Sequence, residues 1–232
     1  MSANAANSQE CVYCGATGCL TRDHVPPKAI FSKPLPSNLI TVPACAKCNN
    51  AASNDDEYFR LSLQVRDQME SHQDVIRSRP VLLRSLEKPQ KAGMRNALIK
   101  NIVLADLVTP SGIFIKKQWA IQTDTDRLRR VVTRIMKGLF FHRNGHRLPD
   151  QYEALVFNEE SVQKWPVETL NVFQENVIKP ILSQPGVTIG NQVFTFRFGF
   201  NTTDTDTTYW IFTFYQQASF LGLTQPCEKG SL

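Results

Sequence analysis

The order of hydrophobic and polar residues predicts a β-rich start followed by a long helix. Two short β-like runs, Leu20–Val25 and 38–42, flank a loop that contains four prolines. From about Cys48 the apolar residues recur at helical spacing, and this helix is expected to end in the mid-seventies. Pro80 and Pro89 are expected to break the helical pattern, so that a second region begins there.

The pattern beyond residue 91 mixes helices and strands. Helices are predicted at 92–107, 123–141 and 166–177, and β runs at 112–121, 152–157, 187–200 and 207–221. Asp124 and Asp126 favour the N-terminus of the second of these helices, and Gly145 follows its end. Aromatic residues alternate along the last two β runs, which predicts a sheet with one buried face. The expected fold class is α+β, with an antiparallel sheet in the C-terminal two thirds.

The composition is that of an ordinary globular protein, with 42% hydrophobic and 20% charged residues. No apolar run approaches the length that spans a bilayer. Residues 1–10 have neither the basic nor the apolar segment of a signal peptide, so they are expected to be a short disordered lead. A reducing, cytoplasmic location is therefore expected.

Four of the six cysteines form two CxxC pairs, Cys11 with Cys14 and Cys45 with Cys48. In a reducing compartment such pairs indicate a metal site rather than disulfides. The two pairs can supply a tetrahedral Cys₄ site that leaves no coordination position open, so the expected ion is a structural Zn²⁺. Coincidental pairing, and replacement of one ligand by Cys19, are the alternatives.

Positive charge is concentrated in the middle of the chain. The net charge is +5 overall, whereas residues 76–150 alone hold 16 Lys/Arg against 5 Asp/Glu. Residues 1–75 and 151–232 are each net acidic. A basic block of this kind is typical of proteins that contact phosphate.

Polar residues of particular types lie between and after the cysteine pairs. Asp23 and His24 follow the first pair, Asn38 comes fourteen residues after His24, and Asn49 directly follows the second pair. This composite pattern resembles the HNH (ββα-metal, His-Me finger) endonuclease family, in its branch with a Cys₄ zinc site. The resemblance covers about residues 11–60 and says nothing of the remainder.

The resemblance implies a role for each of these residues. His24 would be the general base that activates water for attack on phosphorus. Asp23 and Asn49 would hold one catalytic divalent ion, Mg²⁺ or Mn²⁺. Asn38 would brace the hairpin loop and orient the base. Asn49 occupies the last position of the family motif, where the family name implies histidine. Asparagine is an accepted variant at that position.

One face of the helix predicted at 123–141 is basic and lies opposite the apolar residues of that helix. With two arginines beyond its end, this face is predicted to contact nucleic-acid phosphates. The residues concerned are Arg127, Arg130, Arg134, Lys137, Arg143 and Arg147. A charged face that is merely solvated is the alternative.

Together these features predict a chain of two parts. Residues 11–75 would form an HNH nuclease module with structural zinc, and residues 76–232 an α+β domain that grips the substrate or regulates the module. The expected activity is endonucleolytic cleavage of nucleic acid, with DNA as the leading substrate and no membrane partner. The alternatives are a non-catalytic zinc-ribbon protein that binds nucleic acid, and a defence or toxin nuclease gated by a ligand on the C-terminal domain. The oligomeric state is open, and a homodimer would bring the two active sites that paired cuts need.

Overall fold

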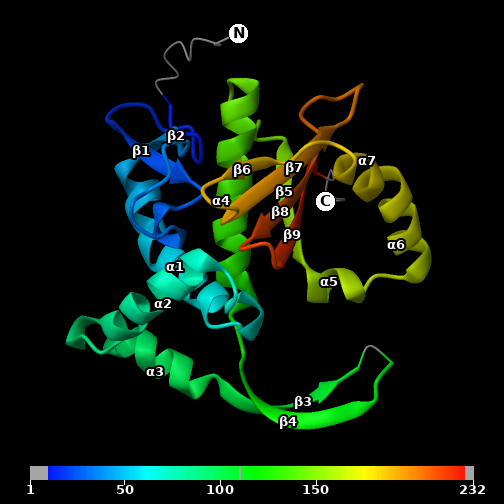
Figure 1. Ribbon diagram of the computed structural model, residues 1–232. Helices are drawn as coiled ribbons and strands as arrows, with labels where there is room; N and C mark the ends of the chain where they lie inside the picture. The colour runs from blue at the N-terminus through cyan, green and yellow to red at the C-terminus, as the bar shows by residue number, and fades with distance from the viewer. Residues whose placement is uncertain (1–9, 110, 228–232) are drawn as a thin grey trace, which may run out of the picture.

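The computed structural model describes residues 10–109 and 111–227 and shows a mixed α+β fold with antiparallel sheets (Figure 1). Strands β1 (Leu20–Val25) and β2 (Ile40–Cys45) form a hairpin, and helix α1 (Ala46–Gln64) follows directly. β1 has the predicted bounds, whereas β2 begins and ends later than the predicted run. Nearly all of the predicted disordered lead lies outside the described residues.

After α1 the chain turns through η2 (Asp67–Met69), α2 (Gln73–Leu86), η3 (Pro89–Lys91) and α3 (Ala92–Lys100). The first helix therefore ends at Gln64, earlier than predicted. The prediction that Pro80 breaks the helical pattern is wrong, because Pro80 lies inside α2. Pro80 and Ile76 are both exposed, so water can satisfy the Ile76 carbonyl that loses its helical donor. No helix among the described residues is both long and apolar enough to cross a membrane.

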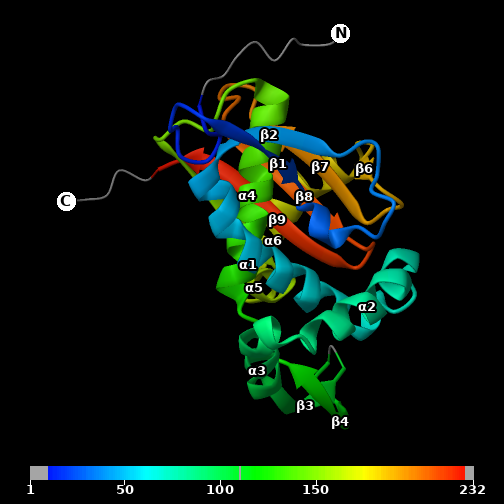
Figure 2. The ribbon, with the colours of Figure 1, turned by 90° about the vertical axis from the view of Figure 1, so that its left-hand side faces the viewer.

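A second hairpin, called the ribbon below, consists of β3 (Ile102–Val108) and β4 (Phe114–Ile121). The helix predicted at 92–107 is wrong in its second half, because α3 stops at Lys100 and the β-branched Ile102 and Val103 begin a strand. Among the described residues the ribbon pairs with no other strand. It follows α3 along the chain and lies apart from the larger sheet (Figure 1 and Figure 2).

Helix α4 (Thr125–Asn144) crosses the middle of the molecule, and both of its ends match the sequence signals. The Asp124 side chain accepts hydrogen bonds from the backbone N–H groups of Asp126 and Arg127, each at 3.1 Å. Gly145 ends the helix with a φ of 78°, a left-handed conformation that glycine adopts without steric cost. The helix prediction at 123–141 is confirmed, with a C-terminus three residues later.

The C-terminal part forms a five-stranded antiparallel sheet in the order β5-β9-β8-β7-β6. Its elements are β5 (Tyr152–Asn158), α5 (Glu159–Gln163), α6 (Val167–Phe173), η4 (Gln174–Ile178), α7 (Lys179–Leu182), β6 (Val187–Ile189), β7 (Phe194–Phe200), β8 (Thr208–Phe214) and β9 (Ala218–Pro226). Each of the two long β runs predicted near the end is thus a pair of antiparallel strands. The predicted buried face is confirmed for Trp210, Phe212 and Phe214, none of which is more than 1% exposed.

One large cluster of buried hydrophobic residues joins the first hairpin, α1, α4 and the five-stranded sheet. Phe59 of α1, for example, packs edge-on against Phe214 of β8, with ring centroids 5.0 Å apart. Gly138 of α4 lies so close to Val25 of β1 that an added Cβ would come within 2.6 Å of a Val25 methyl carbon. The predicted domain boundary after residue 75 falls inside α2, and residues on both sides of it share this core.

A candidate zinc centre and the hairpin beside it

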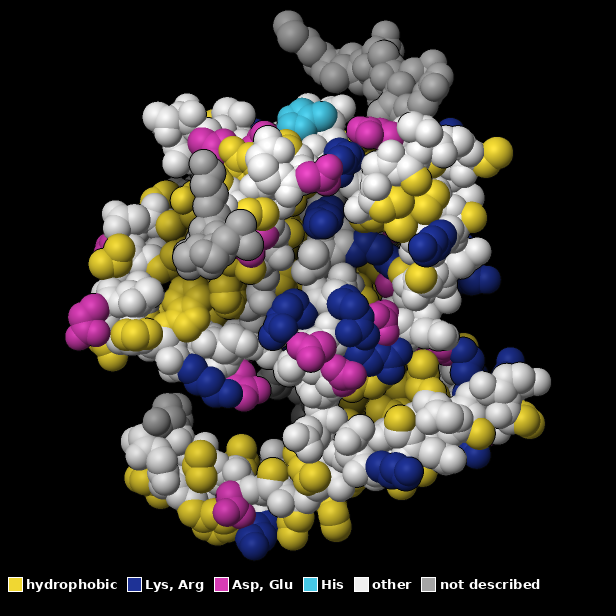
Figure 3. Space-filling model, turned by 180° about the vertical axis from the view of Figure 1, so that it is seen from behind, with side chains coloured by type: hydrophobic (Ala, Val, Ile, Leu, Met, Phe, Trp, Pro, Cys, Tyr) yellow, Lys and Arg dark blue, Asp and Glu magenta, His cyan; other side chains and the backbone are white. Residues whose placement is uncertain are grey.

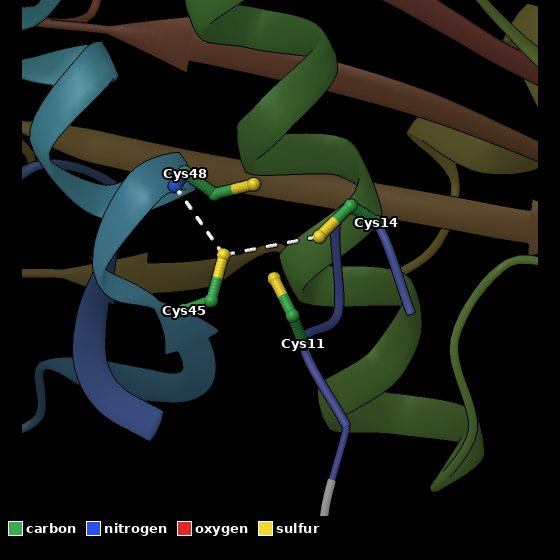
Figure 4. A group of neighbouring side chains, drawn as sticks. All are labelled: Cys11, Cys14, Cys45 and Cys48. Atoms are coloured by element: carbon green, nitrogen blue, oxygen red, sulfur yellow. Dashed lines mark hydrogen bonds between the residues drawn. The ribbon is translucent and has the colours of Figure 1, made fainter. Parts of the chain in front are cut away.

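The four cysteines of the CxxC pairs come together at one point (Figure 4). Their sulfur atoms all lie within 4.8 Å of one another, and the Cys14 and Cys45 sulfurs are 3.8 Å apart. Four sulfurs at about 2.3 Å from one Zn²⁺ form a tetrahedron with edges of about 3.8 Å. The cluster therefore fits a metal ion such as zinc, and its four protein ligands would leave no open coordination position.

The local backbone explains how each pair reaches this point. The N–H groups of Cys11 and Gly15 donate to Ala16 O and Cys11 O, each at 2.8 Å, and fold the first pair into a tight turn. Gly15 has a φ of 70°, which suits glycine. Cys45 ends β2 and caps α1, so Cys48 falls on the first helical turn.

The two cysteines of the second pair lie in different electrostatic surroundings. The backbone N–H of Cys48 donates to the Cys45 sulfur at 3.4 Å and is the main cause that lowers the pKa of Cys45 to about 7. Burial, in contrast, raises the pKa of Cys48. A helix N-terminus stabilises a thiolate, which is the form that binds metal. Cys19 and Cys227 are exposed and lie outside the cluster.

Asp23 points from β1 into the protein and is only 5% exposed. Its Oδ2 accepts a hydrogen bond from the Tyr13 hydroxyl at 2.7 Å and lies 3.4 Å from the Arg134 Nε of α4. Burial and the nearby Asp23 charge raise the pKa of Tyr13, so Tyr13 keeps its proton as a donor. Arg134 also binds both carboxylate oxygens of Asp56, at 2.8 and 2.7 Å. Asp23 thus belongs to a charged network close to the cysteine cluster, because Tyr13 lies between Cys11 and Cys14 in the chain.

Asn49, on the first turn of α1, faces the same side of the hairpin as Asp23. Its Nδ2 donates to the Thr21 hydroxyl at 2.9 Å, and Thr21 precedes Asp23 by two residues on β1. Side chains two residues apart on a strand share a face and are about 7 Å apart along it. The Oδ1 of Asn49 makes no hydrogen bond with any residue that the structure describes.

His24 and Asn38 lie elsewhere on the hairpin. His24 is half-buried, and strand alternation places its ring on the face opposite Asp23 and Val25, beside Thr41 of β2. The structure records no hydrogen bond to this ring from any described residue. Asn38 donates to Thr188 O at 2.9 Å, so it ties the loop before β2 to strand β6.

The predicted phosphate-binding residues of α4 mostly contact acidic residues of α1. Arg127 and Arg130 both bind Asp55, each at 2.7 Å, in addition to the Arg134 pair with Asp56. Lys137 has no recorded ion pair with a described residue. That these basic residues of α4 contact nucleic acid stays a prediction. Their ion pairs with Asp55 and Asp56 show that three of them also hold α4 against α1.

The two arginines beyond the basic face are engaged as well. Arg147 pairs with Asp150 at 2.6 Å, and Arg143 stacks over the Phe198 ring at 3.7 Å from its centroid. Sequence analysis missed Tyr13 as a neighbour of this site, and it did not show that Asp55 and Asp56, which lie close behind Asn49, would pair with the arginines of α4. The acidic pair lies seven and eight residues after Cys48, which at helical spacing is a weak signal for the same side of α1.

A pocket of about 580 Å³ opens between α1 and α4 beside the cysteine cluster, and Cys48 is part of its lining. Ala51, Ala52 and Val131 contribute apolar surface to it, and Arg129, Arg130, Arg134 and Lys137 also line it. Figure 3 shows Lys and Arg side chains gathered over the middle of the face seen from behind, with acidic side chains among them.

Compared with the models of known protein families, with curated proteins and with solved structures, the chain matches none.

Proposed function

We propose that this protein is a metal-dependent endonuclease of the HNH type that hydrolyses phosphodiester bonds, with DNA as the leading substrate. The observation that carries the proposal is the shared face of Asp23 and Asn49. One residue comes from β1 and the other from the first turn of α1, and the cysteine cluster lies at the junction of β2 and α1. A hairpin and a helix held together in this way keep two metal ligands at a fixed separation.

The donor atoms suit a hard divalent cation. A carboxylate from Asp23 and the carboxamide Oδ1 of Asn49 are the oxygen ligands that Mg²⁺ and Mn²⁺ prefer. When bound, such an ion polarises the phosphate and stabilises the leaving oxygen. His24 would accept the proton of the attacking water, because a neutral imidazole is a base near neutral pH. Since its ring lies on the other face of β1, His24 must reach the phosphate around the strand edge, near where the strand ends at Val25.

The pocket between α1 and α4 supports a polyanionic substrate. Arg130 shares Asp55 with Arg127, so two cations face one carboxylate there. Lys137, without an ion pair among the described residues, adds a further positive charge to the lining. A DNA strand whose phosphates contact Arg130 and Lys137 would pass next to the cysteine cluster and the first turn of α1. Such contacts would make binding weaken steeply with salt.

The proposal is tested by incubating the zinc-loaded protein with supercoiled plasmid and either Mg²⁺ or Mn²⁺. We expect nicked or linear product, and a rate at least about 100-fold lower for His24→Ala, which removes the base. Asn49→Ala should lose a similar factor. His142→Ala, a change at an exposed histidine near the end of α4, is the matched control and should keep the full rate.

Two results would contradict the nuclease proposal. If protein shown to be folded and to contain zinc leaves the plasmid intact with every divalent ion, the protein is not a nuclease. Nicking that survives His24→Ala at an unchanged rate would show that another base or a contaminant is responsible.

A specific observation favours the second candidate, a zinc protein that binds nucleic acid without cutting it. Asp23 already accepts the Tyr13 hydrogen bond and lies beside the Arg134 guanidinium, so its charge is balanced without a metal ion. Fluorescence anisotropy with a labelled duplex distinguishes the candidates. Salt-dependent binding together with an uncut duplex in Mg²⁺ and Mn²⁺ would establish the binding protein.

A further inference from the structure

A second pocket, of about 570 Å³, lies where the end of α1 meets the base of the ribbon. It is far along α1 from the cysteine cluster, since the lining begins at Ser62 and Cys48 lies on the first turn. Its volume is in the usual range for sites that bind small molecules, about 300–1,000 Å³. None of the described side chains that line it is acidic.

The hydroxyl of Ser62 is a buried polar group without a partner. Ser62 is 1% exposed, and its Oγ makes no hydrogen bond to any described residue. Buried hydroxyls are nearly always hydrogen-bonded in folded proteins, because an unpaired one loses its hydration without compensation. An acceptor or donor supplied by a ligand in this pocket would satisfy it.

The guanidinium of Arg66 is a partly buried cation that also lines the pocket. The structure records no ion pair for it with any described carboxylate. Burial lowers the pKa of Arg66, and the negative charge of Glu159 offsets this only in part. A desolvated cation is normally paired, so an anion in the pocket would complete the site.

Trp119 supplies a flat aromatic surface on the ribbon side. Trp119 is 73% exposed, although large aromatic residues are usually buried. Ile102 and Ile121, which pair across the ribbon, add apolar surface next to it, and Gln118 adds an amide. An exposed indole beside a cation is suited to stacking on a planar ring whose substituent is anionic.

We propose that this pocket binds a small anion that carries a flat ring, of the nucleotide class. The anionic group would bind Arg66 and Ser62, and the ring would stack on Trp119. One guanidinium and one exposed ring match one anionic group and one ring, whereas an acidic peptide would call for several cations. The inference goes beyond the proposed nuclease activity and does not depend on it, because the two sets of residues share no member.

Isothermal titration calorimetry of the full zinc-loaded protein tests this with adenosine monophosphate, adenosine and inorganic phosphate. We expect adenosine monophosphate to bind at least tenfold more tightly than either of its parts. Arg66→Gln and Trp119→Ala should each weaken this binding by at least tenfold. Arg77→Gln, which changes an exposed arginine of α2 outside the pocket, should leave it unchanged.

Three outcomes would overturn the proposal. Equal affinity for inorganic phosphate and adenosine monophosphate would mean a simple anion site, and absence of binding at millimolar concentration would mean no site. Loss of binding in Lys137→Gln but not in Arg66→Gln would place the nucleotide in the pocket between α1 and α4. Thermal melts show whether each variant is folded, and no cleavage assay is needed, so failure here leaves the nuclease proposal untouched.

Discussion

Within the part of the chain that the structure describes, two hairpins lie outside the main sheet, and their surroundings differ completely. In the first hairpin, Val25, Val42 and Ala44 are at most 1% exposed, because α1 and α4 pack against them and the cysteine cluster lies at one end. In the ribbon and the turn between its strands, eight large hydrophobic side chains are exposed. They are Ile102, Val103, Leu104, Val108, Ile113, Phe114, Ile115 and Trp119.

The difference shows that a hairpin takes its stability from what covers it. A two-stranded hairpin alone is marginal in water. The first hairpin gains a helix on its inner face and a cysteine cluster that can bind metal. The ribbon relies on its own backbone ladder and on cross-strand pairs such as Leu104 with Trp119. Local sequence predicted the first hairpin and β4 as β structure but most of β3 as helix, and it could not distinguish the two situations.

Loss of the metal should change the stability of the first hairpin relative to the ribbon more than any other change described below. We expect Cys48→Ser, or chelation, to destabilise the zinc-loaded protein by roughly 3 kcal/mol or more, because structural zinc contributes directly to folding. That corresponds to a fall in Tm of about 10 °C for a protein of this size. Differential scanning calorimetry measures it, and Cys227→Ser, outside the cluster, is the control.

Hydrogen exchange then shows where the stability was lost. Amides of β1 and β2 should exchange faster in Cys48→Ser, whereas those of the ribbon should keep the rates of the unchanged protein. An equal acceleration in both hairpins, or a melting temperature unaffected by chelation, would mean that the cysteines do not hold the first hairpin through a metal.

A methyl group added at Gly138 should have an intermediate effect. The new Cβ would approach a Val25 methyl to 2.6 Å, so Gly138→Ala should cost about 1–3 kcal/mol through overpacking between α4 and the first hairpin. Gly93→Ala in α3, beside the ribbon, meets no atom within 4 Å and should be neutral or stabilising by at most about 1 kcal/mol. Urea unfolding of both variants measures the contrast, and equal effects would refute the close packing.

The smallest effect should come from the ion pairs that hold α4 against α1. Burial acts to raise the pKa of Asp55, but hydrogen bonds and charges from Arg130 and Arg127 outweigh it and keep the pKa below its ordinary value. The stability that these ion pairs contribute is fully present above about pH 4, the ordinary pKa of an aspartate. It is lost as the pH falls through the lower pKa that Asp55 has in the folded protein.

Asp55→Asn should therefore flatten the acid side of the stability curve. Because Arg130 is largely exposed, the expected difference at neutral pH is less than about 1 kcal/mol, and salt should reduce it. Urea titrations between pH 3 and pH 7 measure it. Parallel curves for the variant and the unchanged protein would show that the pair contributes nothing.

The sequence predicted those elements whose ends carry their own chemistry. The Asp124 cap and Gly145 fixed the ends of α4, and β1 had its predicted bounds. The errors arose where local patterns were ambiguous. The segment after Asn101 is apolar enough to be read as helix or strand, and the turn at Tyr215 between β8 and β9 contains neither glycine nor proline.

The candidate site was predictable to a similar, partial extent. The CxxC spacing identified the four cysteines, since each pair is local. The partners of Asp23 were not identifiable, because Tyr13 and Arg134 reach it through tertiary packing. Helical spacing placed Arg127 and Arg130 on one face, but nothing in it showed that Asp55 would lie opposite them.

Tyr215 has a consequence for the order in which the chain acquires its structure. Its hydroxyl donates to the carbonyl of Ile30, just beyond β1, and accepts a hydrogen bond from Gln64 at the end of α1. The contact with Ile30 spans 185 residues. During synthesis the loop after β1 must therefore wait for nearly the whole chain before this bond can form. Contacts of such long range slow folding, so the hairpin beside the cysteines would reach its final form among the last parts of the protein.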